Sequence, residues 1–410
     1  MSAKIAAPRG TFDILPEQAA QRDLLERAAR ELLEAAGYQR IETPAFEATE
    51  LFARGVGEAT DIVQKEMYSF DDGGGRSLTL RPEGTAPICR AYVEHGMHKL
   101  PAPVKLYYLG PFFRAERPQA GRYREFWQVG AEALGSDEPA VDAELITLLA
   151  RLLTKLGCAG VRLRLGSLAN ARVRAAYREE LAAYLRAHEE QLSETVRSRI
   201  DLNPLRAFDS DDPATKAVMA GAPRLLDRLD GEDAEHFADV RRLLDLAGVA
   251  YEIDSTLVRG LDYYTRTLFE FTSDSLGAQS ALGGGGRYDG LVELIGGPPT
   301  PGIGWAAGIE RMMLASGLEA SAPPPPDLYV AHETRAPDAF KLVLDARAAG
   351  LRAQMELAGR SLKGQLKHAE RLEARYVAIV EQDGVRLRDR ESGAERTLSA
   401  EAVVAQVLAS

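Results

Sequence analysis

The sequence predicts an α+β domain with a mixed, mainly antiparallel sheet and a helical insertion, followed by a small α/β domain. Residues 106–133 carry two aromatic-rich runs around a polar loop with Gly and Pro, which is typical of an antiparallel β-hairpin. Residues 321–326 include four consecutive prolines, a stiff spacer that marks a domain boundary. Strand and helix patterns alternate beyond it. We therefore expect domains at 1–320 and 327–410.

Composition places the chain among ordinary globular proteins. Apolar residues make up 45% and charged residues 27% of the 410 residues, and no apolar run approaches the roughly 18 residues of a membrane span. The start of the chain lacks the apolar core of a signal peptide. The cysteines Cys89 and Cys158 lie outside any Cys-x-x-Cys or Cys/His cluster. We expect a reduced, cytoplasmic protein without membrane contact or structural zinc.

The net charge of −11 argues at first against a nucleic-acid partner. However, residues 327–410 contain 13 Lys and Arg against 13 Asp and Glu, so the first 326 residues carry all of the net negative charge. A local basic stripe can therefore still contact phosphates.

The first hairpin has one apolar and one polar face, because side chains alternate along a strand. Arg114 and Glu116 share the polar face of the first run, and Gln128 and Glu132 share that of the second. Trp127 faces the core by the same alternation. Burying such polar groups costs several kcal/mol each unless they are paired, so this face suggests a ligand site. The alternative is a solvated face with surface ion pairs.

Upstream of this hairpin, apolar positions recur at i+4 from Leu24 to Ala36, with Leu25, Ala29 and Leu33 beside them. This single stripe predicts a helix of about five turns that ends at Gly37. A strand at 40–44 follows. Two further runs, at 63–68 and 77–80, predict a second hairpin around a Gly-rich turn.

The segment Arg81-Pro82-Glu83-Gly84-Thr85 bends the chain so that Glu83 and Thr85 can lie together. A carboxylate and a hydroxyl suit an ammonium group, which has three donors. The alternative is a helix start with Thr85 as the capping residue and Glu83 beside it, and both interpretations can hold.

After the first hairpin, the pattern predicts a helix at 138–156 and a strand at 161–165. Residues from about 170 to 248 form the predicted helical insertion, with the clearest helices at 189–199 and 225–246. This stretch carries little recognisable chemistry.

Three Gly-containing segments follow the insertion. Residues 257–265 place Arg259 beside a glycine and ahead of two tyrosines, where it could bind an anion or form a structural ion pair with Asp262. Four glycines at 283–286 allow close backbone approach to a planar ligand. Residues 302–311 predict a small-residue strand that turns into a helix, with a spacing unlike the dinucleotide-binding fingerprint.

In the C-terminal domain the strand–helix alternation favours a largely parallel sheet. The predicted elements are 327–331, 336–349, 352–356, 361–372 and 376–380. The core stripe of the second helix is Leu362, Leu366 and Ala369. A neighbouring face carries Arg360, Lys363, Lys367 and Arg371, which is either solvated surface or a phosphate contact.

Taken in order, these segments resemble the three motifs of class II aminoacyl-tRNA synthetases. The long helix and strand resemble motif 1, the hairpin with Phe-Arg-x-Glu resembles motif 2, and 302–311 resembles motif 3. R-A-E-R-P-Q-A-G-R-Y-R-E-F-W-Q-V-G-A-E, R-G-L-D-Y-Y, G-G-R-Y-D-G-L and the stretch 359–380 are similar to segments of histidyl-tRNA synthetases. Trp127 departs from the His expected there. The chain is identified by this resemblance as a member of that family.

The resemblance implies that ATP activates L-histidine to histidyl-adenylate, with Mg²⁺ bridging phosphate oxygens, and that histidine then passes to the 3′ end of tRNA(His). It implies a homodimer with motif 1 at the interface, and an insertion that leans toward the tRNA acceptor end.

The implied catalytic residues are Arg114 and Arg259. The implied histidine-binding residues are Glu83, Thr85, Arg114, Gln128, Glu132, Arg259, Tyr263 and Tyr264. The implied ATP-binding residues are Arg114, Glu116, Arg122 and Arg311. The implied tRNA-binding residues are Gln119, Arg360, Lys363 and Lys367.

A second family has the same implied fold but does not catalyse the reaction. The regulatory subunit of ATP phosphoribosyltransferase shares this catalytic fold, lacks the tRNA-binding domain and typically departs from the catalytic arginines. Arg114, Arg259, Arg311 and the C-terminal domain favour the synthetase here.

Overall fold

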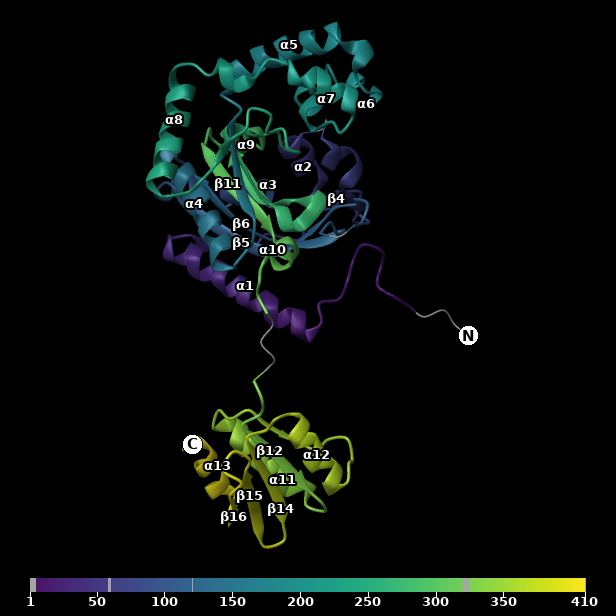
Figure 1. Cartoon of the computed structure of the whole chain (residues 1–410), viewed down its shortest axis with the longest axis vertical. Helices are drawn as coiled ribbons and strands as arrows, with labels where there is room; N and C mark the ends of the chain where they lie inside the picture. The colour runs from purple at the N-terminus through teal and green to yellow at the C-terminus, as the bar shows by residue number, and fades with distance from the viewer. Residues whose placement is uncertain (1–4, 58–59, 120, 320–323, 410) are drawn as a thin grey trace. The chain divides into compact units, whose positions relative to one another are not determined.

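The computed structural model describes residues 5–57, 60–119, 121–319 and 324–409. The chain forms two compact units, Met1–Ala320 and Ser321–Ser410 (Figure 1). Residues 320–323, which include half of the proposed linker, lie outside the described residues. None of the described helices is long and apolar enough to cross a membrane.

Within the described part of the first unit, eight strands form one mixed sheet in the order β1-β5-β6-β11-β10-β9-β7-β8. The strands are β1 (Gln39–Arg40), β5 (Val104–Phe113), β6 (Glu125–Leu134), β7 (Val161–Ser167), β8 (Glu252–Ile253), β9 (Thr265–Ser273), β10 (Ala281–Arg287) and β11 (Gly302–Gly308). The pairs β1–β5 and β7–β8 are parallel and the others are antiparallel. The predicted mixed, mainly antiparallel sheet is therefore confirmed.

One face of the sheet packs against helices in a large apolar core (Figure 1). These helices are α1 (Pro16–Ala35), α4 (Pro139–Lys155), α8 (Gly231–Leu246) and α10 (Ile309–Ala315). The buried stripe of α1 runs through Leu25, Ala29 and Leu33, whereas Leu24 is 37% exposed. The expected stripe is therefore buried in the core of its own chain through these three residues, and Leu24 lies at its edge. Trp127 packs against this core, with the Arg22 guanidinium 3.5 Å from its ring centre.

The opposite face of the sheet packs against the earlier part of the insertion and two helices of the main unit in a second apolar core. The helices are α3 (Thr85–Glu94), α5 (Ala171–Ala187), α6 (Glu194–Arg197), α7 (Pro213–Ala220) and α9 (Leu291–Leu294). The expected helix at 189–199 is wrong, because the extended backbone at Leu192 and Ser193 separates the 3₁₀ turn Glu189–Gln191 from the short α6. The short 3₁₀ turns of the unit are Met97–Lys99, Glu189–Gln191, Pro204–Asp209, Leu225–Arg228 and Asp274–Gln279.

A small three-stranded sheet in the order β2-β4-β3 lies beside α2 (Thr49–Val56). Its strands are β2 (Phe46–Ala48), β3 (Tyr68–Asp71) and β4 (Ser77–Leu80). The expected strand at 63–68 is wrong for most of its length, because Ile62–Glu66 forms a π-helix whose apolar side chains pack against α2. The expected strand at 40–44 is likewise limited to the two residues of β1.

Among the described residues of the second unit, five strands form a sheet in the order β13-β12-β14-β15-β16. Its elements are β12 (Leu328–His332), α11 (Ala336–Ala348), β13 (Ala353–Met355), α12 (Leu362–Arg371), β14 (Tyr376–Glu381), β15 (Gly384–Asp389), β16 (Glu395–Leu398) and α13 (Ala400–Leu408). The expected alternation is confirmed. The expectation of a largely parallel sheet is wrong, because a two-residue turn at 382–383 reverses the chain into an antiparallel hairpin.

The core stripe of α12 also differs from the expected one. Leu366 is 36% exposed, and its predicted place is taken by Gln365, which is 2% exposed. The Gln365 amide accepts from the His332 backbone N–H (2.9 Å) and donates to the His332 carbonyl (2.8 Å). These two bonds attach the helix to the end of β12.

Candidate functional site

The site lies on the sheet face where polar residues of β6 meet small residues of β11. Glu132 is opposite Gly304, and Gln128 is opposite Gly308. A Cβ atom at residue 304 would lie 1.6 Å from a carboxylate oxygen of Glu132. Glycine is required there because any side chain would displace the carboxylate.

A cavity of about 340 Å³ opens over this face, and four arginines line it. They are Arg114, Arg122, Arg259 and Arg311, which come from motif 2, its loop, the Arg-Gly-Leu-Asp-Tyr-Tyr segment and motif 3. Glu116, Gln128 and Glu310 also line the cavity. Four guanidinium groups around one cavity suit a ligand with several negative oxygens, such as a triphosphate.

Backbone carbonyls orient two of these arginines. Strand β5 ends at Phe113, and the Arg114 Nε donates to the Pro82 carbonyl (2.9 Å). The Arg311 Nε donates to the Gly121 carbonyl (2.7 Å) and its Nη1 to that of Ala281 (2.8 Å). Burial and the nearby charges of Arg122 and Arg114 lower the pKa of Arg311. The clustered positive charges therefore favour an anion in the cavity.

Carboxylates hold the other two arginines. Arg259 forms an ion pair with Glu270 on β9, and Arg122 forms one with Glu116. The suggested pairing of Arg259 with Asp262 is wrong, because Asp262 instead accepts a hydrogen bond from the Asn203 amide (2.8 Å). Arg259 thus has a structural partner and also lines the cavity.

Glu83 lies at the start of α3 and caps it. Its two carboxylate oxygens accept from the backbone N–H groups of Thr85 (2.8 Å) and Ala86 (3.0 Å). The alternative in which Thr85 caps the helix is wrong, because Thr85 is already helical. Its hydroxyl donates to Glu132 instead (2.9 Å).

Buried tyrosines complete this cluster. The Tyr263 hydroxyl donates to Glu83 (3.3 Å), and the Tyr288 hydroxyl donates to Glu132 (2.7 Å). The ring of Tyr264 packs against that of Tyr263, with 4.8 Å between their centres. Tyr288 was not among the expected site residues, although the Gly-Arg-Tyr-Asp-Gly stretch after the glycine run contains it.

Burial raises the pKa of both carboxyl groups, that of Glu132 to about 8. Their hydrogen bonds from hydroxyl and backbone groups oppose this effect only in part. Two buried carboxyls among tyrosine hydroxyls suit a ligand that carries positive charge or several N–H donors. The cluster therefore fits an amino acid with a nitrogen-containing side chain.

The expected tRNA-binding residues lie outside both parts of the site. Gln119 is exposed at the tip of the hairpin and pairs with the backbone of Arg122. In the second unit, Arg360 and Lys367 line a shallow depression on α12, and Lys363 is exposed on the same helix. Arg360 also contacts Glu356 at 3.2 Å.

The pKa of Glu132 predicts how stability depends on pH. The unfolded group titrates near about 4.3, so between this pH and 8 the folded chain holds a proton that the unfolded chain has lost. Rising pH therefore destabilises the native protein through Glu132. Glu132→Gln cannot titrate, so the variant should match the native protein near pH 5 and exceed its stability by about 2–4 kcal/mol near pH 8.5.

Urea unfolding followed by tryptophan fluorescence measures this difference, because both tryptophans, Trp127 and Trp305, belong to the first unit. Stability profiles of the two proteins that stay parallel from pH 5 to 8.5 would contradict the raised pKa.

Comparison with known proteins identifies the family. The model for "Histidyl-tRNA synthetase" matches residues 10–312, and that for "Anticodon binding domain" matches residues 329–410. The histidine–tRNA ligase of Desulforudis audaxviator is 47% identical over 98% of this chain and 97% of its own length. That of Halorhodospira halophila is 51% identical over 92% of this chain and 90% of its own. The crystal structure of apo S. aureus histidyl-tRNA synthetase superposes with a TM-score of 0.81 at 35% identity, covering 98% of this chain and all of that one. The chain belongs to the histidyl-tRNA synthetase family.

Proposed function

We propose that the chain is a histidine–tRNA ligase, which joins L-histidine to ATP as histidyl-adenylate, releases pyrophosphate, and transfers histidine to the 3′ end of tRNA(His). The arrangement of the site carries this proposal. An arginine-lined cavity and a buried carboxylate–tyrosine cluster lie along the same face of β6, at Gln128 and Glu132. The first suits the phosphates and the second suits the amino acid.

In the proposed first step, the histidine carboxylate attacks the α-phosphorus of ATP and pyrophosphate leaves. Arg114 would bind both the carboxylate and the α-phosphate, and Arg259 would bind the α-phosphate from the other side. Two fixed guanidinium groups stabilise the charge that develops on the phosphoryl oxygens. The remaining contribution is orientation of the reactants, so no protein base is needed. Arg122 and Arg311 would bind the distal phosphates.

The amino-acid end of the site accounts for selectivity. Glu83, Thr85 and Gln128 would hold the α-ammonium group, while Glu132, Tyr263 and Tyr264 would surround the imidazole. The Glu83 oxygen that accepts from Ala86 can accept a further bond, whereas the other oxygen already accepts from both Thr85 and Tyr263. An apolar side chain would leave these buried groups unpaired and is therefore rejected.

Mg²⁺ would enter with the nucleotide. Among the described residues, no group of three or more His, Cys, Asp or Glu side chains is arranged as a metal site. The cavity does offer Glu116 and Glu310. This set fits Mg²⁺, which binds nucleotides through one or two carboxylates and the phosphates and neutralises phosphate charge.

We assign the second unit to tRNA, in line with its match to the anticodon-binding model. Gln119 would contact the acceptor end, and Arg360, Lys363 and Lys367 would contact the backbone near the anticodon. Both cysteines are free thiols, and Cys89 is buried, which agrees with a reducing compartment such as the cytoplasm.

The regulatory-subunit alternative is weaker. A structure described as an ATP phosphoribosyltransferase regulatory subunit/histidyl-tRNA synthetase from Bacillus halodurans superposes with a TM-score of 0.65 at 24% identity, which speaks only for a shared fold. Arg114, Arg259 and Arg311 of this chain all line the cavity. A protein without the reaction has no need for them.

We further propose that the protein is a homodimer. The apolar stripe of α1 packs against the core of its own chain, so the support for a dimer comes from another surface. Phe46 and Phe70 lie side by side on the small sheet with 6.1 Å between ring centres, and they are 49% and 44% exposed. Such apolar surface favours association.

Light scattering at micromolar concentration should give twice the chain mass, and an active monomer would contradict the dimer.

ATP–pyrophosphate exchange with each of the twenty amino acids tests the proposed activity. We expect exchange with histidine alone, because only its side chain pairs the buried carboxyl and hydroxyl groups. Charging of tRNA(His) by the same preparation tests the second step. Exchange with another amino acid, or with none, would overturn the assignment.

A further inference from the structure

The segment that carries Arg259 has little structure of its own. Residues 257–264 form neither helix nor strand. Their described backbone bonds are few, and one of them joins the Asp262 N–H to the Val56 carbonyl (3.2 Å). A segment of this kind relies on side chains from its neighbours for a fixed position.

The insertion supplies these side chains. The Asn203 amide donates to the Asp262 carboxylate (2.8 Å), and Arg174 donates to the Tyr264 carbonyl. The Arg206 guanidinium lies 3.5 Å from the position that a Cβ atom would take at Gly260, next to Arg259. The insertion therefore contacts the segment at three places, beside Gly260, at Asp262 and at Tyr264.

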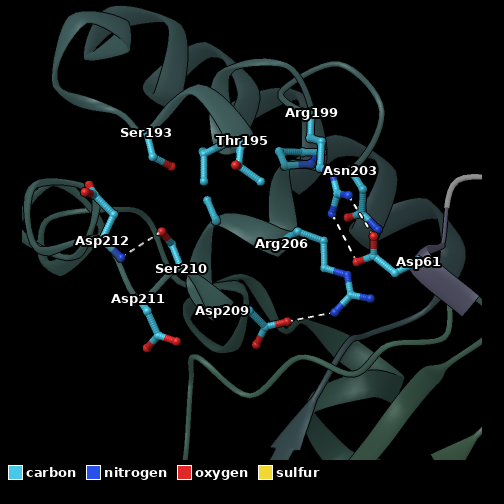
Figure 2. A pocket seen from close by; sticks show the side chains of 13 residues that line it. Asp61, Ser193, Thr195, Arg199, Asn203, Arg206, Asp209, Ser210, Asp211 and Asp212 are labelled. Atoms are coloured by element: carbon cyan, nitrogen blue, oxygen red, sulfur yellow. Dashed lines mark hydrogen bonds and ion pairs between the residues drawn. The ribbon is translucent and has the colours of Figure 1, made fainter. Parts of the chain in front are cut away.

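A second contact from the insertion leads to the segment that carries Arg114. Arg199 binds Asp61 through two nitrogens, at 2.8 and 3.2 Å (Figure 2). Asp61 precedes the π-helix Ile62–Glu66, and the Glu66 carbonyl accepts from the Ala115 N–H (2.7 Å). Ala115 lies between Arg114 and Glu116.

Both contacts start from one short stretch of the insertion. Figure 2 shows Arg199 and Asn203 beside each other above Asp61, at a cavity between the insertion and the main unit. The Asn203 N–H also donates to the Arg199 carbonyl (2.8 Å), so a backbone hydrogen bond links the two residues. The turn that carries Arg199 and Asn203 thus contacts the segment of Arg259 and, through Asp61, the segment of Arg114. These two arginines face the α-phosphate in the proposed reaction.

We propose that Arg199 and Asn203 are positioning residues for adenylate formation, which rests on the proposed function. Asn203 acts on Arg259 through Asp262, and Arg199 acts on Arg114 through Asp61 and the π-helix. Neither residue touches the reacting atoms. Their effect is on orientation, where a displacement of about 1 Å costs roughly a hundredfold in rate.

Variants that exchange the amide and the carboxylate of the Asn203–Asp262 hydrogen bond test this inference. Asn203→Ala should lower the rate of single-turnover adenylation about ten- to a hundredfold. The KM for histidine should stay within about twofold, because Tyr263 is also held by Glu83 and by neighbouring rings. Asn203→Asp, which places two carboxylates together, should be at least as slow. Asn203→Asp with Asp262→Asn restores an amide–carboxylate bond in the reverse sense and should recover most of the rate.

The matched control is Asp201→Asn, which removes the exposed ion pair of the same insertion with Arg186 and should leave the rate unchanged. Melting curves accompany each variant. Should Asn203→Ala melt early, Arg199→Lys decides the question, because it keeps the charge but loses the two-point contact with Asp61 and should also slow adenylation.

Native-like adenylation by Asn203→Ala, or a double variant no faster than Asn203→Asp, overturns the positioning role. Failure of the proposed function has a different signature, since the native protein itself would then show no exchange with histidine. In that case the positioning role falls with it.

Discussion

The burial of the Glu132 carboxyl is the constraint on which the rest of the site depends. A carboxyl group with no exposed surface requires hydroxyl donors, and Thr85 and Tyr288 supply them. It also requires space, which Gly304 provides on the neighbouring strand. Thr85 in turn lies at the start of a helix that Glu83 caps. Each of these residues therefore has a structural task in the buried cluster.

The arginines follow a different principle. Their positive charges lie close together around one cavity, where they raise the free energy of the ligand-free protein and stabilise a bound polyanion. Glu116 and Glu270 partly neutralise Arg114, Arg122 and Arg259, and carbonyl groups orient Arg114 and Arg311. The arginine side chains are thus held in fixed positions, and nearby carboxylates neutralise their positive charge only in part. In the proposed reaction, this surplus of positive charge is what stabilises the phosphoryl transition state.

Much of this architecture follows from the sequence, because period-2 alternation places Gln128 and Glu132 on one face and Val129 and Ala131 on the other. Resemblance to a family added the residues that local pattern could not connect, such as Arg259 and Arg311. Errors arose where long-range contacts override local pattern. The π-helix at Ile62–Glu66 forms because its apolar residues pack on α2. The partner of Arg259 was missed because Glu270 lies on the next strand and not beside it in the segment.

The most direct measurement of the central claim, that Arg259 acts on the α-phosphate, compares two single-turnover rates in Arg259→His. One is adenylate formation from histidine and ATP, and the other is transfer of histidine from preformed adenylate to tRNA. The account predicts a loss of at least about a hundred- to a thousandfold in the first rate and a much smaller loss in the second. Loss of the ion pair with Glu270 lowers the melting temperature, but it does not account for the difference between the two rates. A variant that melts early but forms adenylate at the native rate would show that Arg259 serves only its ion pair with Glu270.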